Sequence, residues 1–133
     1  RCRSVALNAF VGNAFSGGSR APSPYAGWRV YHKLSTVTDP KPTDLWLMVD
    51  EHPDSINDGW MITDVTDPRN WRDLPGSLHA GGCGFNYVDG HSELKRWRVA
   101  STRKPVVRMD FGGMYVTDNR DVLWMIERSS APE

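Results

Sequence analysis

The sequence has no long hydrophobic run. Its longest uninterrupted apolar segments are Leu45–Val49 and Val122–Ile126, whereas a membrane-spanning helix needs about 20 consecutive apolar residues. No secretory leader is visible either, and the first residue is Arg1 rather than Met. We therefore expect the chain to be a processed form or a fragment, with any anchor or export signal upstream of Arg1.

The chain also lacks a charge imbalance and a cysteine framework. Lysine plus arginine equals aspartate plus glutamate, at 16 each, so electrostatics gives no reason to expect nucleic acid as a partner. The two cysteines, Cys2 and Cys83, form no C-x-x-C pattern, which argues against a zinc ribbon or a thioredoxin-like redox site. A Cys2–Cys83 disulfide and two separate buried thiols both fit the sequence.

Common catalytic motifs are missing too. No G-x-G-x-x-G lies between a strand and a helix, and no G-x-S-x-G is present. Cys83 with His79 or His91 can be written as a catalytic dyad, but the glycines around Cys83 favour a flexible loop and nothing marks its thiol as activated. Glu51 and Asp89 can be paired as in a glycosidase, but many other carboxylates would serve equally well. We therefore expect no catalytic residues and no enzymatic activity.

What is present is a composition typical of one globular domain, which we assign to residues 1–133. Hydrophobic residues make up 39% and charged residues 24% of the chain. The apolar run Leu45–Val49 predicts a strand buried on both faces, and residues 60–62 resume apolar structure after an acidic loop. Residues 27–34 fit a strand, and residues 5–11 fit either a strand or a short helix.

Two local signals are clearer. Asp89-Gly90 lies between two segments able to form strands, which predicts a β-hairpin with a type I′ turn. The segment Asp118–Arg128 predicts a helix, with Asp118 as its N-cap and an apolar stripe on one face. The expected fold class is therefore α+β, with an antiparallel sheet and little helix.

The stretch around this hairpin resembles a known family. Residues 77–91 read SLHAGGCGFNYVDGH, so that His79 is followed by nine residues and then by Asp89-Gly90. This resembles the prepilin-type processing-associated H-x9-D-G domain. Three more stretches resemble the same family, and with residues 77–91 they extend over the chain from end to end: residues 3–12, 50–58 and 121–125.

The resemblance implies a fold, a location and partners. It implies a pilin-like fold, in which a long N-terminal helix, missing from this chain, packs on an antiparallel sheet. It further implies the globular part of a type II secretion pseudopilin or type IV pilin-like protein. Such a part lies in the periplasm or at the cell surface, anchored in the inner membrane through the upstream helix, and assembles with other pilin-like subunits. The implied role is non-catalytic and structural.

A cluster of acidic residues and histidines leaves two interpretations open. In the structural one, Asp89 forms the turn and His79 anchors the hairpin to the loop of residues 50–58. In the other, carboxylates bind a divalent cation: calcium as a hard ion, or zinc if histidines such as His52 take part. Arg69, Arg72, Lys95 and Arg96 are available as internal counterions, so we rank calcium second and expect no resident cofactor. The candidate metal ligands are Asp50, Glu51, Asp54, Asp58 and His91.

Aromatic residues suggest an alternative function. The chain has six tryptophans, and exposed rings can stack on sugars. Trp46 lies in an apolar run and Trp124 on the predicted helix, where burial is expected. Trp71, between Asn70 and Arg72, is the best candidate for an exposed ring. The alternative is therefore a surface-displayed glycan- or ligand-binding module on a pilin-type anchor, and a metal-dependent hydrolase ranks third.

Overall fold

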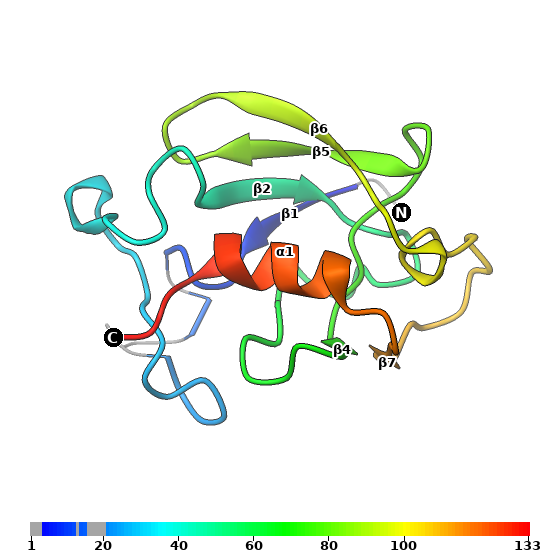
Figure 1. Cartoon of the computed structure of the whole chain (residues 1–133), viewed down its shortest axis with the longest axis horizontal. Helices are drawn as coiled ribbons and strands as arrows, with labels where there is room; N and C mark the ends of the chain where they lie inside the picture. Colours follow the sequence, from blue (N-terminus) through cyan, green and yellow to red (C-terminus); the bar gives the residue numbers. More distant parts are fainter. Residues whose placement is uncertain (1–3, 13, 16–20) are drawn as a thin grey trace.

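The structure is a computed structural model that describes residues 4–12, 14–15 and 21–133. Within these ranges the chain is mostly β, with two short 3-10 turns and one α-helix at its C-terminal side (Figure 1). The elements are β1 (Val5–Asn8), η1 (Leu34–Thr36), β2 (Trp46–Asp50), β3 (Trp60–Met61), β4 (Asn70–Trp71), β5 (Gly82–Tyr87), β6 (Ser92–Arg96), η2 (Ala100–Thr102), β7 (Met114–Tyr115) and α1 (Arg120–Ser129).

Five strands form one mixed sheet in the order β3-β1-β2-β5-β6, and β4 pairs with β7 in a separate two-stranded ribbon. The expected antiparallel pairing is confirmed for β1–β2, β2–β5 and β5–β6. It is wrong at β3, which runs parallel to β1 with Leu7 opposite Trp60. The connection through β2 and the acidic loop is long enough to bring β3 back in the same direction as β1, as a parallel pair requires.

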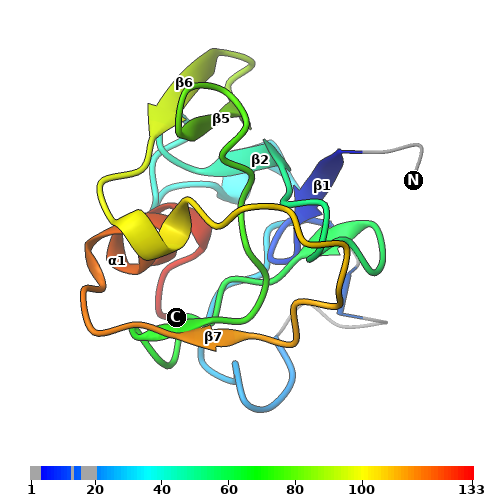
Figure 2. The ribbon, with the colours of Figure 1, turned by 90° about the vertical axis from the view of Figure 1, so that its right-hand side faces the viewer.

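Helix α1 lies between the large sheet and the β4–β7 ribbon (Figures 1 and 2). Val122 and Met125 are buried, as the apolar stripe predicts. Asp118 is not the N-cap. That position belongs to Asn119, which makes no capping side-chain bond, and Asp118 instead pairs with Arg120, with 2.7 Å between Oδ2 and Nη2. No helix among the described residues is long and apolar enough to span a bilayer.

The core between these layers is aromatic. The ring of Phe85 packs edge-on against Trp124, with 5.2 Å between centroids, and against Trp97 at 6.0 Å. Trp71 continues the chain of rings, 6.2 Å from Trp97, and is only 1% exposed. Edge-to-face pairs of this kind stabilise a core beyond their buried area. The prediction of an exposed Trp71 is therefore wrong, because β4 turns this ring inward against the sheet.

The β5–β6 hairpin is confirmed, but its turn type is not the predicted one. The N–H of Gly90 donates to the carbonyl of Tyr87 at 3.0 Å, and the N–H of Tyr87 donates to the carbonyl of His91 at 2.9 Å. Gly90 has a φ of 95°, whereas Asp89 does not have a positive φ. A single left-handed residue after a turn is the three-residue hairpin loop with a bulge, not a type I′ turn, which needs two.

The glycines around Cys83 are predicted to form a flexible loop, and this is wrong for Gly82 and Gly84, which lie in β5. Gly82 begins β5 and lies so close to β6 that a Cβ there would stand 2.0 Å from the carbonyl oxygen of Lys95. Only glycine allows this approach. A turn with two residues of positive φ, Ala80 and Gly81, instead lies just before β5. The residues that flank it, His79 and Gly82, exchange two backbone hydrogen bonds of 3.1 Å.

Three other segment predictions have mixed outcomes. The strand alternative for residues 5–11 is correct at β1. Residues 27–34 form no strand and make only isolated bridges to Val11 and Pro132. Strand β2 is buried on one face rather than both: Trp46 and Val49 are buried, while the residues between them are half-buried.

Candidate functional site

The H-x9-D-G residues frame β5. His79 lies at the turn that precedes the strand, and Asp89-Gly90 form the turn that follows it. At the first turn, the His79 ring nitrogen Nε2 is 3.4 Å from Oδ2 of Asp50, at the end of β2. The same Asp50 oxygen accepts the N–H of Gly84 at 3.2 Å. The predicted contact between His79 and the loop of residues 50–58 is therefore present.

The contact made by His79 is nevertheless at the surface, since its side chain is 60% exposed. The buried histidine of the loop is His52, which the sequence presented only as a zinc ligand. Its ring is 0% exposed; Nδ1 lies 3.2 Å from the N–H of Asp54, and Nε2 lies 2.9 Å from the carbonyl of Lys104. This pattern fits a ring with its proton on Nε2. His52, not His79, is therefore the internal anchor of the loop.

Two aspartates of this loop accept hydrogen bonds from backbone N–H groups. Asp54 is 5% exposed and accepts the N–H groups of Val107 and Arg108, both at 2.8 Å. Asp58 accepts the N–H of Trp60 at 2.7 Å. Backbone N–H groups, as well as cationic side chains, can therefore stabilise the negative charge of these carboxylates.

The other candidate metal ligands also have protein partners. Glu51 is buried and accepts the hydroxyl of Ser55 at 2.9 Å. His91 stacks on Tyr87 with 4.3 Å between ring centroids, and its Nδ1 is 2.6 Å from Oδ1 of Asp89. The hydrogen bond from the His91 ring, with its backbone N–H, lowers the pKa of the Asp89 carboxyl. Across the part of the chain that the structure describes, no three His, Cys, Asp or Glu side chains gather to hold an ion.

Cys83 is a free thiol within β5 and is 0% exposed. Burial raises its pKa above the ordinary value for cysteine. A thiol that stays protonated is a poor nucleophile, so the dyad with His79 or His91 has no support in this geometry. Cys2, the other half of the disulfide alternative, lies outside the described residues.

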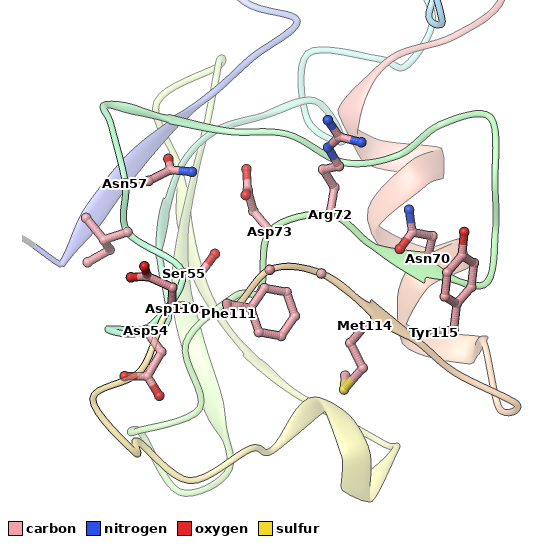
Figure 3. Close-up of a pocket in the computed structure, with 13 residues that line it drawn as sticks. Asp54, Ser55, Asn57, Asn70, Arg72, Asp73, Asp110, Phe111, Met114 and Tyr115 are labelled. Carbon is pink, nitrogen blue, oxygen red and sulfur yellow. The ribbon is translucent and has the colours of Figure 1, made fainter.

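Residues 54–57 of the loop of residues 50–58 line a cleft of about 800 Å³, together with residues 70–73 and residues 110–115 (Figure 3). Tyr115 and Asn70 stand side by side on the paired strands β7 and β4. Asp73 lies between Asn57 and Arg72 in the view of Figure 3. The lining is mixed: aspartates, one arginine and two asparagines, with Phe111, Met114 and Tyr115.

The carboxyl of Asp73, in the lining of this cleft, has a raised pKa. Burial raises the pKa of its carboxyl from 3.8 to about 6, although the N–H of Ile62, 2.6 Å from Oδ2, partly opposes this effect. Asp73 as a whole is 8% exposed. A perturbed carboxyl in a cleft is a common mark of a functional site. The one sequence signal that could indicate this cleft is the glycine pair 112–113 between Phe111 and Met114-Tyr115.

Comparisons of the chain with models of protein families, with curated proteins and with solved structures gave no match.

Proposed function

We propose that the chain is the globular part of a pilin-like structural subunit in a bacterial envelope secretion or surface-fibre system. The observation that carries the proposal is the placement of the signature residues. His79 and Asp89-Gly90 occupy the turns at the two ends of β5, a central strand of the sheet. They shape the hairpin and lie outside the cleft, as expected of residues with an architectural role.

The sheet edge gives such a subunit a surface for assembly. Strand β6 forms one edge of the large sheet, and four of its five residues are exposed. An edge strand presents unpaired backbone groups to a neighbour. Lys95 and Arg96 on this edge limit indiscriminate pairing, because their charges must be matched or kept in water. The proposed partners are other pilin-like subunits, and the neutral net charge of the chain gives no reason to add nucleic acid.

The proposal includes a location, in the periplasm or at the cell surface, with an inner-membrane anchor upstream of Arg1. It is tested by protease accessibility of the full-length protein in intact spheroplasts, with a cytoplasmic protein as the protected control. We expect the domain to be digested in spheroplasts that have not been lysed. Without protease, the full-length protein should fractionate with the inner membrane. Digestion only after lysis would overturn the proposal.

Assembly is tested with single cysteines in the full-length protein carrying Cys2→Ser and Cys83→Ser. Leu94→Cys on β6 should give a cross-linked species with pilin-like subunits, whereas Leu34→Cys on η1, equally solvent-exposed, should not. If both cysteines cross-linked to the same extent, the role of the β6 edge would be wrong.

The binding-module alternative loses its original basis, because the ring of Trp71 is buried. The cleft supplies a different basis, which is independent of the assembly role.

A further inference from the structure

The cleft has the dimensions of a ligand site. Its volume of about 800 Å³ falls within the range of about 300–1,000 Å³ typical of small-molecule sites. Its walls come from three segments far apart in the sequence, residues 54–57, 70–73 and 110–115. Pairing between β4 and β7 joins the second and third segments, and the N–H of Phe111 donates to the carbonyl of Asp54 at 3.1 Å and so joins the first to the third. A site built on paired strands keeps its side chains in fixed positions.

Tyr115 gives the cleft an exposed aromatic face. It is 76% exposed, more than any other large hydrophobic residue in the described ranges. Its backbone is nevertheless fixed. Tyr115 pairs with Asn70 across the ribbon, and the N–H of the next residue, Val116, donates to the backbone carbonyl of Arg69 at 2.9 Å. A rigidly held tyrosine offers contact area at a low cost in conformational entropy. Its flat face suits the C–H face of a sugar ring.

The polar groups in the rest of the lining include both donors and acceptors. Asp73 supplies a carboxyl whose position is fixed by the N–H of Ile62, and Arg72 supplies guanidinium donors. Asn70 is held through its Nδ2, which donates to Asp64 at 2.9 Å. A hydroxyl group donates and accepts, so a ligand rich in hydroxyls can match this mixture, whereas a purely anionic or purely apolar ligand cannot.

The charge of the lining selects among such ligands. Three aspartates and one arginine line the cleft, so acidic ligands are repelled. Asp54, with two amide donors, is already balanced within the protein, so the lining does not act as a concentrated cation site. The glycine pair 112–113 adds a wall with no side chains, and a Cβ on Gly112 would meet no atom within 4 Å.

We propose that this cleft binds a neutral oligosaccharide, with Tyr115 stacking on a sugar ring and Asp73, Asn70 and Arg72 hydrogen-bonding its hydroxyls. The inference does not depend on the pilin-like role, because an isolated domain would bind in the same way.

The test is binding of immobilised neutral cello-, xylo-, manno- and chito-oligosaccharides, with oligogalacturonate as the acidic comparison. The best neutral probe is then titrated calorimetrically against matched variants. Tyr115→Ala should weaken binding about tenfold and Tyr115→Phe should largely restore it, because the ring is the contact. Asp73→Asn should weaken binding, while Leu94→Ala on the distant β6 edge should not. Unchanged melting of Tyr115→Ala would show that the fold persists.

Several outcomes would overturn the inference. One is that no neutral saccharide binds, and another is that Tyr115→Ala binds as well as the wild-type protein. A third is preferential binding of lysine-rich peptides that is lost in Asp73→Asn and Asp110→Asn, which would make the cleft a site for basic peptides instead. None of these outcomes would bear on the cellular location of the full-length protein.

Discussion

Replacing Asp73 by asparagine probes the electrostatics of the cleft. The residue is 8% exposed, and burial raises the pKa of its carboxyl from 3.8 to about 6. At about 1.4 kcal/mol per pH unit, keeping this group ionised costs the folded state about 3 kcal/mol at pH 7 relative to the unfolded chain. Asparagine has a similar shape, carries no charge and keeps an oxygen that can accept the N–H of Ile62.

We therefore expect Asp73→Asn to raise the free energy of unfolding at pH 7 by about 1–3 kcal/mol, less than the full cost because a neutral acceptor bonds Ile62 more weakly. The sign of the pH dependence follows from the raised pKa. The folded state holds its proton more tightly, so the wild-type protein loses stability as pH rises from about 4 to about 6 and then levels off. The variant lacks this loss, and the two proteins converge near pH 4.

The assay is urea unfolding followed by tryptophan fluorescence between about pH 4 and pH 8. Asp67→Asn is the matched control, because Asp67 also accepts a backbone N–H, that of Arg69 at 3.0 Å, but at an exposed site. The control should show no comparable gain. A constant difference between Asp73→Asn and wild type at every pH, or a destabilised variant, would refute the reasoning. A gain in stability together with weaker saccharide binding is the trade-off expected of a residue kept for function.

Three further predictions concern the signature and the acidic loop. His79→Ala should lower the free energy of unfolding by less than about 1 kcal/mol, because its pair with Asp50 is exposed to solvent; a loss of several kcal/mol in urea titrations would contradict this. Gly90→Ala should cost about 1–2 kcal/mol, since Gly90 has a φ of 95°, and an unchanged urea midpoint would contradict the turn assignment. Millimolar calcium or a chelator should leave the melting temperature unchanged, because backbone amides meet the Asp54 carboxylate; a rise with calcium would point to an ion site.

Local signals predicted the elements that depend on neighbours in sequence. The Asp89-Gly90 hairpin and the helix near the C-terminus were both found, because turn residues and a helical stripe act within a few positions. Their details were missed. The type of turn depends on how β5 twists against β6, and Asp118 does not cap α1 because its carboxylate pairs with the side chain of Arg120.

The features that the sequence did not predict depend on contacts between residues far apart in the chain. The inward ring of Trp71 depends on the pairing of β4 with β7, which lie over forty positions apart in the chain. The cleft depends on the same pairing, so composition pointed to a stacking tryptophan where the structure presents Tyr115. Similarly, the sequence does not show which of His52 and His79 is buried, and only the burial of His52 separates the internal anchor from the surface contact.

The pilin-like assignment is tested most directly by mass spectrometry of the protein isolated from its native cells. A pilin-type subunit is cleaved within its leader and methylated at the new N-terminus, followed by an apolar stretch of about 20 residues. We predict a mature N-terminal peptide of this kind upstream of Arg1, with an N-methylated first residue. An unprocessed N-terminus beginning with the initiator methionine, with no apolar stretch before Arg1, would contradict the assignment.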